Sequence, residues 1–328
     1  YARKIANHFD FDHQDLVINP DIVDLLTKLI WHLDEPLADA AAINTYLISK
    51  TARENGIYVL LNGIGGDEIF GGYRKHFACL KAESYQRSLP NFFQNLVVKL
   101  SEHLPVASSK SGHKLIRWGK RFLSFASLPK TERFLSSDMS LNPNEYHKLF
   151  VDGTSYWETH FFKSQVENFN GNYLSYLTQM CLNDTQVFLT EHNLTYADKA
   201  TMAASVESRP PLTDHHIVDF MFSLPPNLRI RKNIQKYLLK KVAEKYLPRE
   251  IIYRPKASFG IPLRSWIRGP LKEMIDEYLS FESIKKRGLY NPEYVKTKIR
   301  LYRAGKEDNA QLIWQLLTNE IWFRTFFN

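Results

Sequence analysis

The sequence predicts an α/β fold in which a small parallel sheet is joined to a large, mainly α-helical remainder. Residues 57–61, IYVLL, form a short apolar run with two β-branched side chains, which indicates a buried strand. A helical pattern precedes this run, and a glycine-rich turn, residues 62–66, follows it directly. Alternation of helix and strand is typical of parallel sheets, in which ligands bind where the strands end.

Two helices are predicted before the strand. The first covers residues 19–33, where apolar side chains recur at helical spacing after Asn19, a favourable N-cap. The second begins near Asp39, another favourable cap, and ends at Gly56. A further strand at 16–18 would complete the strand–helix–strand order of a parallel sheet.

The remainder of the chain is predicted to be helical. Residues 77–183 lack recognisable site chemistry, and their segments 89–104 and 114–125 are amphipathic. The basic face of 114–125 fits a solvated surface helix, and a membrane-surface or partner helix is the alternative. Residues 233–246 predict a helix with Leu, Val, Ala and Tyr on one face, and 312–327 predict a last aromatic helix in the core.

Composition narrows the class of protein but does not choose its ligand. The 328 residues are 44% hydrophobic, enough for a sizeable core, and no apolar run is long enough to span a membrane. Two cysteines, Cys79 and Cys181, fit core thiols in a reducing cytoplasm. The net charge of +8 favours anionic partners, so nucleic acid, an anionic membrane and a polyphosphate substrate all stay open.

The turn Asn62–Glu68 is the first cluster that could carry chemistry. Its glycines let backbone N–H groups approach an anion closely, whereas Asp67 and Glu68 would repel a phosphate. A hard cation such as Mg²⁺ between carboxylate and phosphate resolves this conflict. The alternative is a tight turn with two acids that cap a helix. The spacing matches neither the dinucleotide fingerprint nor the Walker A loop.

Two further clusters lie in the second half of the chain. Asp198 and Met202 would share one face of a helix, and Glu207 and Arg209 would share one side of an extended segment. A structural ion pair or cap is the alternative there. Lys256 lies in a stiff, basic, proline-bounded loop and could reach a phosphate, although a solvated surface lysine explains it equally.

The adjacent histidines His215 and His216 invite a metal hypothesis. Neighbouring side chains on a helix are expected to point in different directions, and no third ligand has suitable spacing. Surface histidines are therefore the expectation.

These three clusters occur in one order, and together they resemble the synthetase domain of glutamine-dependent asparagine synthetases. The likeness spans nearly the whole chain and is weakest across about 80–180. The family patterns are SGxGxDExFGGY, DEPxxDxxAxxTYLxSK, D[KR]xSM…ExRxPxLD, KxxLRK and RxKxxFxxPxxxW. The corresponding segments of this chain are, in the same order, NGIGGDEIFGGY, DEPLADAAAINTYLISK (34–50), DKATM…ESRPPLTD, KYLLKK (236–241) and residues 254–266.

The resemblance implies a fold and its division along the chain. The fold is that of the ATP-pyrophosphatases, also described as adenine nucleotide α-hydrolase-like, of which the sheet here would be a remnant. Residues 1–77 would be the α/β part, 78–183 a helical variable part, and 184–328 a helical part that carries active-site segments. The likeness also implies a cytoplasmic enzyme and allows a homodimer.

The implied chemistry is an ATP-dependent, AMP-forming amide ligation. ATP adenylates a carboxylate, aspartate or a related acid, with release of pyrophosphate; glutamine-derived ammonia then attacks the acyl-adenylate, and AMP leaves. The family requires Mg²⁺. Carried over by motif, the metal ligand is Asp67, the catalytic residues are Lys256, Glu68 and Arg209, with Glu207 as a further organiser, and the nucleotide contacts are Leu61, Asn62, Gly63, Ile64, Gly65 and Asp198.

Two departures from the family pattern qualify this expectation. The pyrophosphate loop SGGxDS and the N-terminal glutaminase domain do not occur in these 328 residues, so the chain is expected to be an N-terminally truncated synthetase domain, inactive alone. Ile64 stands where asparagine-forming enzymes usually have glutamate. The alternatives are an amidotransferase for another carboxylate in polysaccharide or peptide biosynthesis, and a non-catalytic or nucleic-acid-binding homologue.

Overall fold

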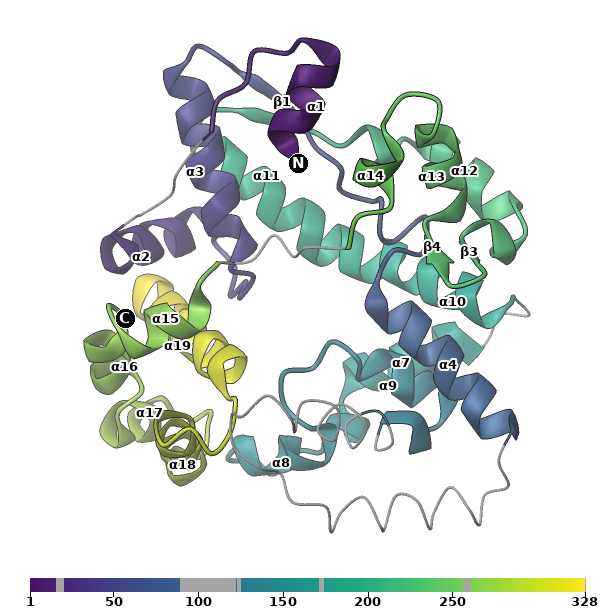
Figure 1. Cartoon of the computed structure of the whole chain (residues 1–328). Helices are drawn as coiled ribbons and strands as arrows, with labels where there is room; N and C mark the ends of the chain where they lie inside the picture. The colour runs from purple at the N-terminus through teal and green to yellow at the C-terminus, as the bar shows by residue number, and fades with distance from the viewer. Residues whose placement is uncertain (16–20, 89–121, 123–124, 171–173, 256–260, 328) are drawn as a thin grey trace. The chain divides into compact units, whose positions relative to one another are not determined.

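The chain forms two compact units. Figure 1 shows the chain coloured by residue number. The computed structural model describes residues 1–15, 21–88, 122, 125–170, 174–255 and 261–327. Unit 1 consists of Tyr1–Gly72, Asp184–Lys272 and Thr318–Asn328, and unit 2 of Tyr73–Asn183 and Glu273–Leu317. Each unit therefore combines segments that are distant in the sequence.

Unit 1 holds the strands of the sheets and many short helices. Its helices are α1 (Ala2–Phe9), α2 (Ile22–Leu33), α3 (Ala41–Glu54), the π-helix η4 (Asp184–Leu194), α11 (Thr195–Met202), η5 (Pro211–Thr213), α12 (His215–Ser223), η6 (Pro226–Leu228), α13 (Tyr237–Ala243), α14 (Arg249–Ile252) and α15 (Leu263–Arg268). Its strands are β1 (Val59–Leu61), β2 (Glu207–Arg209), β3 (Ile230–Arg231) and β4 (Ile234–Gln235).

Unit 2 is helical in its described part. It contains α4 (Arg74–Ser88), α7 (Lys130–Leu135), η2 (Pro143–Glu145), α8 (Tyr146–Leu149), η3 (Tyr156–Glu158), α9 (His160–Asn170), α10 (Tyr176–Asn183), α17 (Phe281–Arg287) and α18 (Pro292–Arg303). Helix α16 (Lys272–Tyr278) begins at the last residue of a unit 1 segment, and α19 (Ala310–Phe326) runs from unit 2 into unit 1. The amphipathic helices expected at 89–104 and 114–125 lie almost wholly outside the described residues.

The predicted parallel sheet is present but small. β1 pairs in parallel with β2, with Val59 opposite Glu207 and Leu61 opposite Arg209. The expectation of a buried strand is wrong, because Val59 is 40% and Leu61 74% exposed. In the described structure β1 has one strand partner, and the side chains at 59 and 61 share a face that is left in solvent. The strand expected at 16–18 lies outside the described residues.

The ends of the two N-terminal helices follow from local capping. α2 begins after Asp21, not Asn19, because the Asp21 carboxylate accepts a hydrogen bond from the Val23 N–H at 3.2 Å. It ends at Asp34, whose left-handed backbone stops the helix. The predicted role of Asp39 is confirmed, since its carboxylate accepts from the Ala41 N–H at 2.8 Å where α3 begins.

A short hairpin replaces the first turn of the helix predicted from residue 233. Lys232 and Asn233 both have positive φ, 49° and 67°, as a two-residue type I′ turn between β3 and β4 requires. Helix α13 therefore begins only at Tyr237. Its predicted apolar face is also narrower, because Val242 and Tyr246 are 49% and 63% exposed.

The C-terminal helix and the cysteines behave as predicted. α19 buries Trp314, Leu317 and Ile321, each with 2% exposure or less. Cys79 and Cys181 are fully buried free thiols, and burial raises the pKa of Cys79 to about 12. No helix in the described residues is both long and apolar enough to cross a membrane.

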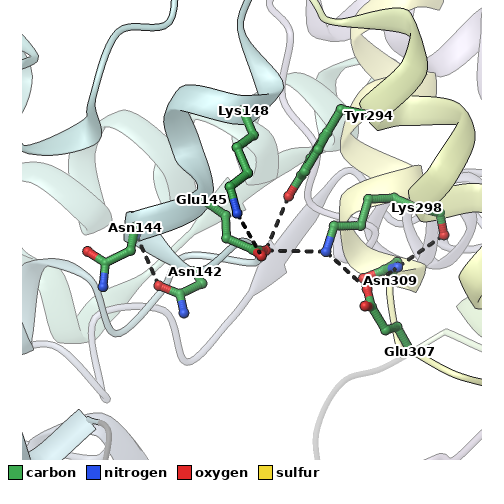
Figure 2. Close-up of polar contacts among 8 residues, drawn as sticks. All are labelled: Asn142, Asn144, Glu145, Lys148, Tyr294, Lys298, Glu307 and Asn309. Carbon is green, nitrogen blue, oxygen red and sulfur yellow. Dashed lines mark hydrogen bonds and ion pairs between the residues drawn. The ribbon is translucent and has the colours of Figure 1, made fainter.

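A polar network joins distant segments within unit 2 (Figure 2). The Lys298 ammonium, on the buried side of α18, lies 3.2 Å from Oε2 of Glu145 and 3.0 Å from Oε2 of Glu307. The Tyr294 hydroxyl also donates to Glu145, at 3.2 Å. Burial acts to raise the pKa of Glu145, but bonding to Lys298 and Tyr294 outweighs it, and the pKa is lowered. The network ties η2 to α18.

Candidate functional site

The glycine-rich turn begins where β1 ends, as the sequence predicts. The parallel ladder continues one residue past Leu61, where the Asn62 N–H donates to the Arg209 carbonyl at 3.0 Å. The Asn62 side chain donates to the Ser208 hydroxyl at 2.5 Å, and its amide oxygen accepts from the Ile64 N–H at 2.9 Å. Asn62 therefore sets the direction in which the chain leaves the sheet.

Two glycines of the turn differ in their conformation and in the space around them. Gly65 has φ +87°, and an added Cβ would lie 2.6 Å from Cγ2 of Thr213, so both conformation and packing require glycine. Gly63 has no positive φ, and an added Cβ would meet no described atom within 4 Å. Gly63 thus faces open space in the described structure, which suits close approach of a ligand to the backbone.

Asp67 lies beside a lysine from a distant part of unit 1. Its Oδ1 lies 3.1 Å from Nζ of Lys236, and both side chains are about one-quarter exposed, at 25% and 27%. An added Cβ on Gly72 would overlap both the Asp67 carboxylate and the Lys236 side chain, so glycine there lets the pair form. Lys236 also has a left-handed backbone, φ 54°, which is uncommon for a lysine and is set by the hairpin before it.

Glu68 points in a different direction from its neighbour. It is 98% buried, with 2% exposure, and its Oε1 accepts a 2.5 Å hydrogen bond from Nδ2 of Asn193, the penultimate residue of η4. The two adjacent acids therefore differ in environment: Asp67 is accessible to solvent, and Glu68 is held in the interior. Residues 64–71 form consecutive turns, so neither acid lies at the start of a helix.

A buried arginine anchors the far end of the turn. Arg229 is fully buried; its Nε donates to the Ile69 carbonyl at 3.0 Å and one terminal nitrogen donates to the Met221 carbonyl at 2.5 Å. Its guanidinium also lies 4.7 Å from the centre of the Phe222 ring. These contacts link the turn to the end of α12, where the helix dipole favours a cation.

Glu207 and Arg209 form the ion pair that their spacing predicts. Nε of Arg209 lies 2.7 Å from Oε1 of Glu207, and a second nitrogen lies 3.2 Å from Oε2. The hydrogen bonds and charge of the guanidinium lower the pKa of Glu207. Both side chains are more than half exposed. The pair therefore contributes little to stability and stays available to a ligand at the end of β2.

Ile64 is a packing residue of the turn. It is partly buried and lies against the cluster formed by Ile69, Phe70, Leu189 and Met221. Its side chain therefore contributes to the apolar underside of the turn, which gives a structural reason for an aliphatic residue there.

The motif segments at 34–50 and 198–214 also meet. The Lys199 ammonium pairs with Asp34 and lies 3.2 Å from Oε1 of Glu35. Burial acts to lower the pKa of Lys199, but the bonds to the two acids outweigh it, and the pKa is raised. Its neighbour Asp198 is exposed, on the same face of α11 as the exposed Met202.

The two histidines lie closer together than the sequence predicts. Their ring centres are 3.9 Å apart, so the expectation that His215 and His216 diverge is wrong for this pair, which stands at the first turn of α12. With Asp214 they bring three ligand atoms within 4.8 Å of one another. Asp214 therefore contradicts the expectation that no third ligand group lies near the histidines. All three residues are exposed, and Oδ1 of Asp214 also accepts from the His216 N–H and so caps the helix.

The structure brings together most, but not all, of the predicted site. Segments 61–68 and 207–209 are adjacent, and Lys236, for which the sequence suggested no role, joins Asp67. Lys236 is the first residue of the segment that matches KxxLRK, and this match was the feature of the sequence that could have identified it. Asn193 and Arg229 lie outside every matched motif and were not predicted. Lys256 lies outside the described residues.

Comparison with known proteins identifies the family of the chain. The family model described as asparagine synthase matches residues 1–324. The chain belongs to the asparagine synthase family, whose domain has an ATP-pyrophosphatase-like fold. The described structure adds that this chain is mostly helical with a small parallel sheet.

Several relatives cover almost the whole chain. Asparagine synthetase [glutamine-hydrolyzing] 1 of Bacillus subtilis is 27% identical, over 98% of this chain and 49% of that protein. A putative asparagine synthetase [glutamine-hydrolyzing] of Mycobacterium tuberculosis is 28% identical, over 96% of the chain and 46% of that protein. Amidase chyE of Penicillium rubens is 24% identical, over 88% of the chain and 44% of that protein. The chain spans about half the length of the curated relatives it matches.

Proposed function

We propose that this chain is the ATP-dependent, AMP-forming part of an amide ligase. Its carboxylate substrate would attack the α-phosphorus of ATP, with pyrophosphate as the leaving group. Ammonia would then attack the acyl carbon, lose a proton, and displace AMP. The proposal rests on family membership and on one geometric observation: at the end of a parallel strand, the turn carries an exposed glycine, Gly63, and a partly exposed carboxylate–lysine pair.

The turn suits a nucleotide and its metal. We propose that Leu61, Asn62, Gly63, Ile64 and Gly65 line the nucleotide, with Gly63 supplying the closest approach. The partly exposed Asp67 carboxylate fits Mg²⁺, which binds through one or two carboxylates plus phosphate oxygens and, when bound, would neutralise phosphate charge.

The Asp67–Lys236 pair suggests how the turn would accept a triphosphate. A phosphate oxygen can replace Asp67 as the partner of the Lys236 ammonium, which frees the Asp67 carboxylate for a cation. Both charges would thus keep a partner before and after binding.

The ion pair at the end of β2 and the acid on α11 complete the proposed site. Glu207 and Arg209 are exposed and would orient the substrates beside the turn, and Asp198 would contact the nucleotide. Glu68 would act from the interior, by fixing the turn. Lys256 stays a proposed stabiliser of phosphate charge on the strength of its motif alone.

Ammonia would come from glutamine. The bacterial relatives are named glutamine-hydrolysing, and the chain covers only about half of each. We propose that a glutaminase domain of the complete protein supplies it.

The acid that is amidated could be other than aspartate. Ile64 packs against an apolar cluster instead of presenting an acid or base to a ligand, and the relative from Penicillium rubens carries the name amidase, not asparagine synthetase. These observations favour a second candidate, an amide ligase for a different carboxylate that uses the same site.

ATP–pyrophosphate exchange by the full-length protein tests the proposal. A panel of aspartate, other amino acids, sugar acids and peptide carboxylates should include at least one that stimulates exchange. Asp67→Asn should abolish the stimulated exchange, and Asp12→Asn, an exposed acid elsewhere, should leave it unchanged. Stimulation by aspartate alone would favour asparagine formation. Absence of Mg²⁺·ATP binding to the full-length protein would contradict the ligase proposal.

A further inference from the structure

A chain of polar side chains leads from the turn to a histidine that the proposed chemistry does not use. Glu68 accepts from Nδ2 of Asn193 at 2.5 Å, and the amide oxygen of Asn193 lies 3.0 Å from Nδ1 of His192. Nε2 of His192 lies 3.6 Å from Oδ2 of Asp39. Asp39 is itself fixed, because its other oxygen caps α3.

The surroundings of His192 hold its ring in one orientation. The ring is stacked on Phe188, with centres 4.7 Å apart and planes at 17°, and meets Tyr196 edge-on at 5.7 Å. Phe188, His192 and Asn193 all belong to η4, an 11-residue π-helix. Such segments are rare and often occur at functional sites.

The donors and acceptors along this chain define which form of His192 it favours. Because Asn193 donates to Glu68 with its nitrogen, it presents an oxygen to Nδ1. Nε2 faces a carboxylate oxygen. The contact with Asn193 therefore requires a proton on Nδ1, which donates to the Asn193 oxygen; the separation between Nε2 and Asp39 is longer than a hydrogen bond.

The other titratable groups beside His192 are consistent with this reading. Tyr196, from α11, has a pKa raised by burial and by the charges of Asp39 and Glu68. Asp39, from the segment before α3, and Tyr196, from α11, therefore flank the imidazole.

We infer that His192 is a positioning residue: its Nδ1–H orients the Asn193 amide, which holds Glu68 and with it the turn that carries Asp67. Loss of this donor turns the Asn193 amide or loosens its contact, and the turn becomes less ordered. This inference rests on the proposed function for its consequence, because an ordered turn is what a nucleotide would require. Its structural part does not depend on that function.

Amide hydrogen exchange of residues 62–70 in the full-length protein, without nucleotide, tests the structural part. His192→Phe keeps a ring against Phe188 and removes the Nδ1–H donor, so exchange in the turn should rise about tenfold or more. His192→Asn can place an amide N–H near the position of Nδ1, so part of the protection should return. His160→Gln, at an exposed position in unit 2, is the matched control.

Asn193→Asp gives a second route if His192→Phe does not fold. It leaves the histidine ring in place and replaces the donor to Glu68 by a carboxylate, so the turn should again lose protection. Wild-type protection in folded His192→Phe or folded Asn193→Asp, or exchange in His192→Asn as fast as in His192→Phe, would overturn the inference.

Titration with Mg²⁺·ATP separates this inference from the proposed function. If both hold, His192→Phe should weaken binding of Mg²⁺·ATP about tenfold. If the wild type binds no Mg²⁺·ATP, the proposed function fails, and the exchange data still decide whether His192 positions the turn.

Discussion

At the residue scale, Gly63 and Gly65 offer a test of binding against folding. Gly65→Ala should lower the free energy of unfolding by about 2–3 kcal/mol, because it forces an L residue to positive φ and against Thr213. Gly63→Ala should leave the free energy of unfolding within about 0.5 kcal/mol of the wild-type value and weaken Mg²⁺·ATP binding. Denaturant unfolding and calorimetric titration measure the two effects. Equal ATP affinity in Gly63→Ala and wild type would remove Gly63 from the site.

The Asp67–Lys236 pair should matter for function far more than for stability. Because both side chains are partly exposed, Asp67→Asn or Lys236→Met should change the free energy of unfolding by less than about 1 kcal/mol. Each should lower ATP–pyrophosphate exchange by about 100-fold or more. A loss of activity that tracks a loss of stability would instead assign the pair a structural role.

A substitution of Ile64 tests whether this residue decides which carboxylate is amidated. Ile64→Glu would place a carboxylate against the apolar cluster of Ile69 and Phe70, so the free energy of unfolding should fall by about 2 kcal/mol. The substitution should not convert the protein into an asparagine-forming enzyme. A folded Ile64→Glu variant that gains aspartate-dependent exchange would show that this one residue sets the product.

The sequence predicts which residues of the turn matter better than it predicts what they contact. The segment NGIGGDE is recognised from its own residues, and the strand before it is predicted from a short apolar pattern. The partners of Asp67 and Glu68, Lys236 and Asn193, are distant along the chain, and tertiary packing alone brings them there. No local propensity contains that information.

At the scale of elements, the Glu145–Lys298 contact predicts a pH effect within unit 2. The pKa of Glu145 is held below its ordinary value, so the contact stabilises the fold above about pH 4.5 and loses this effect as pH falls through the lowered pKa. Lys298→Met should therefore lower the free energy of unfolding by about 1–2 kcal/mol at pH 7, and by less at pH 3.5. Urea unfolding at both pH values measures this difference.

Lys296→Met is the matched control for that prediction. Lys296 lies on the same helix, α18, and is exposed, so its substitution should have an effect below about 0.5 kcal/mol that does not depend on pH. A Lys298→Met effect of the same size at both pH values would contradict the assigned role of Glu145.

Helix existence is predicted from the sequence more reliably than helix ends. α3 and α19 match their predicted segments because a cap or a long apolar pattern marks them. α13 starts late because the β3–β4 hairpin takes its first residues, and two positive-φ residues without glycine give no sequence signal. The exposure of β1 could not be predicted either, because an apolar run does not indicate how many strands and helices pack against it.

At the scale of the whole molecule, the 328-residue chain should not catalyse ATP–pyrophosphate exchange by itself. The family motif SGGxDS does not occur in these 328 residues, so the triphosphate would lack the contacts of that loop. The full-length protein should catalyse the exchange with the correct carboxylate. Exchange by the isolated chain at a rate near that of the full-length protein would refute this prediction.

The parallel pairing of β1 with β2 has a consequence for the order of folding. The hydrogen bond between Asn62 and Ser208 joins residues 146 positions apart, and the 73–183 segment of unit 2 lies between them in the chain. Closing so long a loop carries an entropic cost that a prior collapse of the intervening segment reduces. The turn should therefore mature late during folding, and a substitution that slows collapse of 73–183 should delay it without changing any of its residues.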